Sequence, residues 1–138
     1  MQELSPEQQG PLILIDASLS DRPLAEALRL VGYTAVAVTD QFEQGARDPV
    51  LIQWLGLQGG IWVTADEKVR REHAEEIKTA GIHILWVRRP KKLGMSKKAQ
   101  LLLLLWVIDP ILDEVRRTRR PLQFLAKYSG AKPKWERL

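Results

Sequence analysis

The stretch Ile61-Trp62-Val63-Thr64-Ala65-Asp66-Glu67 decides the fold of this chain, because it predicts a buried strand that ends in acids. Its apolar and β-branched residues follow the turn pair Gly59-Gly60, and such a run between turn signals is typical of a short buried strand. An earlier run, Leu12-Ile13-Leu14-Ile15, ends in the same way in Asp16. Open α/β sheets place their chemistry at the carboxyl ends of strands. Two such strands lying near one another would bring Asp16 and Asp66 to one edge.

Helices and strands alternate through the first two thirds of the chain. Besides the runs at 12–15 and 61–64, the pattern predicts strands at 34–38 and 82–87, a loop at 39–47, and helices over about 20–31, 48–58 and 68–80. This βαβαβαβ order predicts an α/β fold with a mainly parallel sheet of four or five strands flanked by helices on both faces.

The last third opens with the basic connector 88–92 and continues in a leucine-rich helix over 97–109. Pro110 is expected to kink or end this helix, with a second helical piece at 111–117. Residues 118–138 match no element. Because the helix 97–109 is apolar all round, we expect it to be buried on more than one side, either in a deep monomer core or in a homodimer contact.

Length and composition indicate one soluble domain over 1–138, since 45% of the residues are hydrophobic. The absence of cysteine excludes disulfides and zinc-thiolate sites. Residues 1–11 carry acids and glutamines rather than a secretory signal, and the longest apolar run, Leu101–Ile108, is too short to cross a bilayer. We therefore expect a cytoplasmic protein that does not contact a membrane.

The charge is divided between an acidic part and a basic part. Residues 1–87 hold 7 basic and 13 acidic residues, whereas residues 88–138 hold 14 basic and 4 acidic ones. An acidic site for a metal beside a basic surface for phosphate points to a polyanionic substrate such as RNA. A solubilising charged surface is the plain alternative.

Three carboxylates are the candidate catalytic and metal-binding groups: Asp16, Asp48 and Asp66. The Asp48-Pro49 pair predicts the start of a helix that faces the same edge, although Asp48 could serve only as the helix N-cap. Neighbouring carboxylates repel unless a cation relieves them, and Mg²⁺ or Mn²⁺ prefers oxygen ligands. Such an ion can activate water without a histidine or serine nucleophile, so His73 and His83 are expected to be structural.

Further residues complete the predicted site. Glu67 is a candidate metal ligand or a first-turn helix residue, and Asp40 is a weaker candidate in a loop. Ser18 and Thr64 are expected either to donate to a phosphate or to orient a carboxylate. The basic side chains expected to attract the RNA backbone are Arg88, Arg89, Lys91 and Lys92.

At these residues the sequence resembles the PIN-domain superfamily, in particular PIN-like proteins related to VapC-type toxins. Leu14-Ile15-Asp16-Ala17-Ser18-Leu19 is similar to the opening Asp-x-Ser/Asn motif, residues 45–52 are similar to the acidic helix start, and Trp62-Val63-Thr64-Ala65-Asp66 is similar to the Thr-x-Asp strand end. The resemblance spans about Leu12–Val87.

The resemblance implies a PIN-like three-layer sandwich and a metal-dependent ribonuclease, often a toxin neutralised by a cognate antitoxin. It assigns Asp16, Asp48 and Asp66 to the metal. Many relatives carry a fourth acid two residues beyond Thr-x-Asp, where this chain has Lys68. Either Glu67 substitutes for it or the site has only three acids. Two other functions stay open: a PIN-like module that binds RNA or a partner without catalysis, and a receiver-like phosphoacceptor domain. The residues after 82–87 and around Asp16 fit a receiver poorly.

Overall fold

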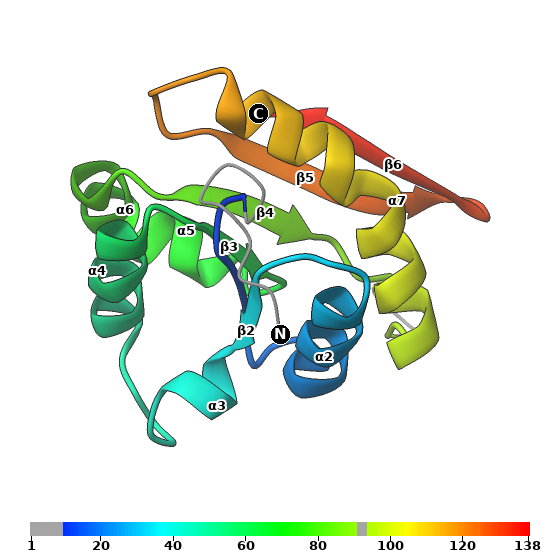
Figure 1. Cartoon of the computed structure of the whole chain (residues 1–138), viewed down its shortest axis with the longest axis horizontal. Coiled ribbons are helices and arrows are strands. Elements are labelled where there is room, and N and C mark those ends of the chain that lie inside the picture. Colours follow the sequence, from blue (N-terminus) through cyan, green and yellow to red (C-terminus); the bar gives the residue numbers. More distant parts are fainter. Residues whose placement is uncertain (1–9, 91–93) are drawn as a thin grey trace.

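The computed structural model of the chain describes residues 10–90 and 94–138 (Figure 1). Its elements follow in this order: β1 Ile13–Ile15, α2 Asp21–Leu30, β2 Ala35–Ala37, α3 Val38–Gln41, α4 Asp48–Gln58, β3 Ile61–Thr64, α5 Lys68–Glu72, α6 Ala74–Ala80, β4 His83–Val87, α7 Lys97–Arg116, β5 Gln123–Ser129 and β6 Lys132–Arg137.

The strands form one six-stranded sheet in the order β2-β1-β3-β4-β5-β6. The pairs from β2 to β5 are parallel, and β6 lies antiparallel to β5 at the edge. The predicted α/β class and mainly parallel sheet are confirmed, whereas the predicted number of four or five strands is wrong. The strands that the prediction lacked, β5 and β6, lie within residues 118–138. This segment contains few of the Val and Ile residues that are typical of strands.

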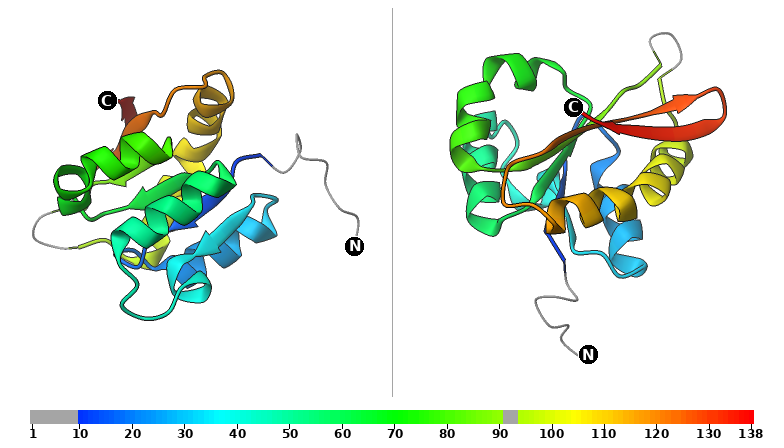
Figure 2. Two further views of the ribbon diagram at one scale, coloured as in Figure 1. Left: turned by 90° about the vertical axis from the view of Figure 1, so that its left-hand side faces the viewer. Right: turned by 90° about the horizontal axis from the view of Figure 1, so that it is seen from above.

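Helices cover both faces of the sheet (Figure 2). Ile13 and Ile15 of β1 lie in the cluster that α2 and α7 form on one face, and Leu14 lies in the cluster of α4, α5 and α6 on the other. All three side chains are fully buried. A parallel strand covered on both faces reads as a continuous apolar run, which explains the absence of alternation in β1.

Helix α7 differs from the prediction because it continues through Pro110 to Arg116. Proline in a helix interior costs roughly 3 kcal/mol, but Ile111, Leu112 and Val115 are buried against the sheet beyond it. Burying an aliphatic side chain stabilises by about 1.5–3 kcal/mol, so the packing of the second half outweighs the proline. The two pieces predicted at 97–109 and 111–117 are one helix.

The outer face of α7 is exposed in the single chain, so the expected burial of this helix in a deep monomer core is wrong. Leu103 and Leu104 are buried, while Leu102, Leu105 and Trp106 are 50%, 38% and 69% exposed. The homodimer contact through 97–109 stays a prediction. None of the helices within 10–90 and 94–138 is long and apolar enough to cross a membrane.

Two smaller differences lie near the acids. The predicted loop at 39–47 begins with the helical turn α3, whose first residues follow β2 directly. The predicted helix 68–80 is divided into α5 and α6 at His73, where the backbone leaves the helical conformation with φ −125° and ψ 26°.

Candidate functional site

Strands β1 and β3 bring Asp16 and Asp66 to one edge of the sheet. The two strands are parallel neighbours with Ile15 opposite Val63. The ladder ends with a hydrogen bond of 2.8 Å from the Asp16 backbone N–H to the Val63 carbonyl. Asp16 therefore follows directly on β1, and Asp66 stands two residues beyond the end of β3.

A hydrogen-bond network fixes the carboxylate of Asp16. Its Oδ2 accepts from the Thr64 hydroxyl at 2.9 Å and from the Ser18 backbone N–H at 3.2 Å. The Ser18 hydroxyl accepts from the Ala65 N–H at 2.9 Å, and Thr64 Oγ1 accepts from the Asp66 N–H at 3.1 Å. Thr64 is fully buried. The Thr64 hydroxyl therefore contacts the Asp16 carboxylate directly, whereas Ser18 contacts it through the backbone; donation to a phosphate stays a prediction for both residues.

The second oxygen of Asp16 is left for a ligand. Both bonds to the side chain use Oδ2, and no other described group donates to Oδ1. Asp66 has a similar arrangement, because its Oδ1 accepts from the Lys68 backbone N–H at 3.1 Å. Glu67 is exposed and occupies the N-cap position of α5 without a side-chain capping bond. Each of the two aspartates is thus oriented by the chain around it while keeping one oxygen available.

Asp48 reaches the same region from the start of α4. Arg47 occupies the N-cap position, so Asp48 is the first helical residue and its carboxylate is not the helix cap. Its Oδ2 lies 3.7 Å from His73 Nε2. The structural role expected for His73 stays a prediction, and the structure adds that this side chain, at the break between α5 and α6, lies against Asp48. No signal in the sequence could have shown it, since the pairing depends on how α4 and α6 pack.

The three aspartates interact electrostatically. The pKa of Asp48 is raised above its usual value, first by burial and then by the negative charge of Asp16, with smaller contributions from Asp66 and Glu72; His73 acts in the opposite direction. Repulsion of this kind favours either a shared proton or a bound cation. A positive charge at this edge of the sheet would therefore reduce the repulsion between the carboxylates.

The donor set fits a hard divalent ion. Carboxylate oxygens are among the ligands that Mg²⁺ and Mn²⁺ prefer, and Asp16, Asp48 and Asp66 supply them. Across residues 10–90 and 94–138, no three acidic or histidine side chains are already gathered closely enough to hold one ion together. The chemistry of the groups suits the metal, and their side chains must draw together to bind it.

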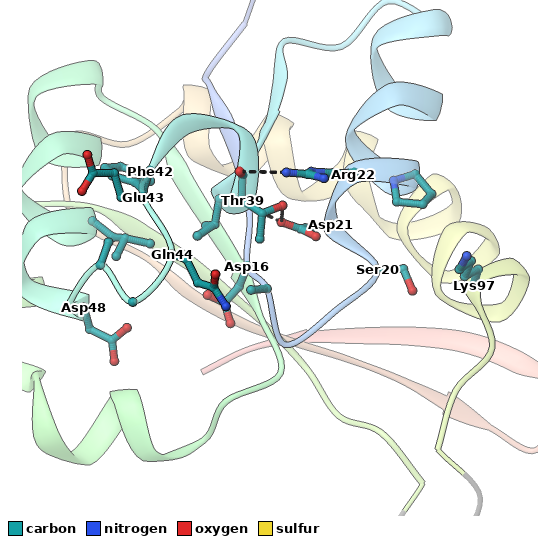
Figure 3. Close-up of a pocket in the computed structure, with 16 residues that line it drawn as sticks. Asp16, Ser20, Asp21, Arg22, Thr39, Phe42, Glu43, Gln44, Asp48 and Lys97 are labelled. Atoms are coloured by element: carbon teal, nitrogen blue, oxygen red, sulfur yellow. Dashed lines mark hydrogen bonds between the residues drawn. The ribbon is translucent and has the colours of Figure 1, made fainter.

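A cavity of about 700 Å³ opens beside Asp16 and Asp48 (Figure 3). One wall is held by Asp21, whose Oδ2 accepts from the Thr39 N–H at 3.0 Å and from its hydroxyl at 2.7 Å. In the sequence, Asp21 lies at the start of the helix predicted over about 20–31, and no local signal indicates its contact with Thr39. Asp40, the weaker acidic candidate, instead pairs with Arg22 at 2.9 Å.

A second pocket of about 800 Å³ contains Asp66 together with the basic side chains. Its lining includes Ser18, Glu67, Arg71, Arg88 and Arg89. The guanidinium of Arg89 donates to the Ser18 carbonyl at 3.1 Å, which ties the connector after β4 to the loop after β1. Predicted RNA contacts at Lys91 and Lys92 lie outside the described residues.

His83 has the structural role that the sequence predicted. Its Nδ1 accepts a hydrogen bond of 3.0 Å from the Leu122 backbone N–H, at the entry to β5. Burial lowers the pKa of its imidazole, which favours the neutral form that this bond needs.

Comparison with known proteins agrees with this geometry. The model of the family described as PIN like domain matches residues 11–89 of the chain. That range includes Asp16, Asp48 and Asp66 and stops before α7. No curated protein and no solved structure gives a significant match. PIN-like domains form a superfamily of nucleases. Because the match covers more than half of the chain and all three acids, the protein belongs to the PIN-like domain family.

Proposed function

We propose that this PIN-like protein is a Mg²⁺- or Mn²⁺-dependent endoribonuclease that hydrolyses phosphodiester bonds of RNA. One observation carries the proposal: three aspartates from separate segments lie along one edge of the sheet, where the charges of Asp16 and Asp66 add to the effect of burial on the pKa of Asp48, although the three carboxylates are not gathered around one point. A bound cation would relieve the repulsion among these carboxylates.

The residues divide into three roles. Asp16 and Asp66 would hold the metal, Asp48 would hold it directly or through water, and Glu67 would take the place of the acid absent at Lys68. The chemistry that a divalent ion supplies when bound is stabilisation of charge on the phosphorus and a lower pKa for water. Thr64 through its hydroxyl and Ser18 through its backbone N–H would hold Asp16 in place, since both donate to its Oδ2.

The basic side chains attract the substrate. Arg88 and Arg89 line the same pocket as Asp66 and Glu67, so a phosphate that they bind would lie beside these two acids. Contacts of Arg and Lys with phosphates supply the sequence-independent part of the affinity of proteins for nucleic acid. These two residues would therefore position the backbone rather than choose the bond that is cut.

The experiment is a cleavage assay on single-stranded RNA with Mg²⁺, Mn²⁺ or a chelator. We expect cleavage only with metal, and Asp16→Asn should abolish it while the protein stays folded. Asp113→Asn is the matched control, because Asp113 undergoes the same change on the exposed side of α7, where it pairs with Arg116. Cleavage by a purified Asp16→Asn protein at the wild-type rate would disprove the proposal.

A second candidate is a PIN-like module that binds RNA or a partner without cutting. The observation in its favour is Lys68, which stands where relatives carry an acid and whose backbone N–H binds Asp66. It predicts salt-sensitive RNA binding without metal-dependent turnover, so the same assay separates the two.

We further propose that the protein is the toxin of a toxin–antitoxin pair with a cognate antitoxin protein as partner. This part rests on the motif resemblance alone. Co-purification of the chain with the product of the neighbouring gene, and relief of growth inhibition by that product, would test it.

A further inference from the structure

The hairpin of β5 and β6 lies outside the part of the chain that matches the family. The match ends at residue 89, whereas the hairpin spans Gln123–Arg137. It widens the sheet beyond β4 and projects from the body of the molecule, as the right-hand view of Figure 2 shows. The residues around the acids therefore do not account for it.

The two faces of the hairpin differ. On one face Phe124, Ala126 and Trp135 belong to the cluster formed with α7. Because side chains alternate along a strand, Lys127 and Lys134 belong to the opposite face. We call this opposite face the outer face of the hairpin. Lys134 is exposed and Lys127 is half-buried, so the outer face presents charge to solvent.

A row of cations runs across three strands on this face. Lys127 of β5 and Lys134 of β6 are directly opposite each other. Val87 of β4 is paired with Ala126, and the Arg88 N–H donates to the Ala126 carbonyl at 2.9 Å, so Arg88 stands beside Lys127. Alternation also places Arg88 on the same side of the sheet as Trp86 and Leu125. These two residues belong to the core cluster on the side of the outer face. We call Arg88, Lys127 and Lys134 the cationic row.

The cationic row is unfavourable for the hairpin by itself. Like charges directly opposite on neighbouring strands destabilise a sheet. None of the three residues forms an ion pair with any carboxylate in the described part of the chain. Glu136 is the acid that lines the pocket of Lys127 and Lys134, and it is not within ion-pair distance of either. The three cations are thus not ion-paired within the described chain, although Glu136 shares this face and lines a pocket with Arg88.

The row begins at the candidate active site. Arg88 lines the pocket that holds Asp66, and strands β4, β5 and β6 follow β3 in order across the sheet. Neighbouring strands lie about 4.8 Å apart, so the row extends roughly 10 Å away from Arg88. A chain of phosphates that passes the acids would meet these cations next.

We infer that the outer face of the hairpin is a second contact surface for single-stranded RNA, in which Lys127 and Lys134 bind phosphates beyond those at Arg88 and Arg89. This inference rests on the proposed function, because it extends the path of the same substrate. The two lysines hold the backbone and touch no reacting atom, so they contribute to affinity and not to the cleavage step.

The test compares two double variants that remove the same charge. Lys127→Gln/Lys134→Gln removes two cations from the row. Lys78→Gln/Arg119→Gln is the control. Lys78 lies near the end of α6, just before β4, and Arg119 lies before β5, so both are at the amino ends of these parallel strands, opposite to the acids and the cationic row. All four side chains are at least partly exposed, and melting curves should show both variants folded.

Binding is measured by fluorescence anisotropy with a labelled single-stranded oligoribonucleotide, with each variant placed in the Asp16→Asn background and without metal. Losing two phosphate contacts should make the slope of log K against log salt shallower by about 1.4. If variant and parent bind equally at 1 M salt, this difference makes the variant bind about 25-fold more weakly than the parent at about 0.1 M salt. The control should keep the parent slope. In the active protein, the hairpin variant should raise KM and leave kcat unchanged.

The outcomes separate the inference from the proposed function. Equal affinity and salt slope for the hairpin and control variants, or no binding of single-stranded RNA by the parent, overturns the inference. Weaker binding by the hairpin variant supports it even if the wild-type protein fails to cleave, since the binding assay does not depend on cleavage. If Asp16→Asn abolishes cleavage but the hairpin substitutions leave RNA binding unchanged, the proposed nuclease activity is supported and the second contact surface is disproved.

Discussion

The hydrogen bonds around Asp16 lead to a prediction that separates its structural role from its metal-binding role. Asp16→Asn keeps an oxygen that can accept from the Thr64 hydroxyl and the Ser18 N–H, whereas Asp16→Ala removes the acceptor for both donors. Thr64 is fully buried, so its hydroxyl cannot turn to water. We therefore expect the alanine variant to be clearly less stable than the asparagine variant.

The magnitude follows from the cost of a buried donor without a partner, about 1–3 kcal/mol. The Ser18 hydroxyl lies 3.4 Å from Thr64 Oγ1 and offers a weak replacement, which favours the lower half of that range. An unfolding entropy of about 2.1 cal/mol/K per residue implies roughly 3 °C of melting temperature per kcal/mol for a chain of this length. The alanine variant should melt about 3–6 °C below the asparagine variant.

Denaturation in the presence of a chelator measures this difference without a contribution from metal binding. Adding Mn²⁺ at 100 times its dissociation constant should then stabilise the wild-type protein by about 2.7 kcal/mol, and neither Asp16 variant should respond in the same way. Equal melting temperatures for the two variants would refute the proposed network. Undiminished stabilisation of Asp16→Asn by Mn²⁺ would refute Asp16 as a metal ligand.

Three further predictions concern the same fold. Carbon-13 NMR titration of the metal-free protein should show Asp48 with a pKa above the ordinary 3.8, and Asp16→Asn should lower it by removing a neighbouring negative charge; an unchanged Asp48 titration would contradict the coupling. Because burial lowers the pKa of His83 below 6.5, the unfolded state binds more protons below that pH, so the free energy of unfolding should fall as the pH drops through about 6.5. His83→Gln should weaken this pH dependence of the free energy of unfolding, measured by urea titration at several pH values. An equally steep pH dependence in the variant and the wild-type protein would show that His83 is not its cause. Gly60→Ala should destabilise the protein by about 1–3 kcal/mol, because a Cβ there would lie 2.4 Å from the Leu12 carbonyl oxygen; wild-type stability in thermal melts would contradict that packing.

The sequence by itself determined the features that depend on short stretches of chain. Uninterrupted apolar runs at β1 and β3 predicted buried parallel strands, and the acids directly after them predicted a shared edge. Asp48-Pro49 predicted the start of α4 for a similarly local reason, the fit of proline to the first turn of a helix. Each of these features is decided by residues within a few positions of one another.

Only the tertiary structure decided the features that depend on contacts between distant segments. Residues 123–137 form strands because β4 offers an edge for pairing, and α7 runs through Pro110 because its second half packs on the sheet. His73 meets Asp48 only once α4 and α6 lie together. The cationic row exists only where three strands are in register, since Arg88, Lys127 and Lys134 are spread over 47 residues of sequence. Local propensity does not encode such pairings, because their free energy comes from surfaces that the chain buries only when it is folded.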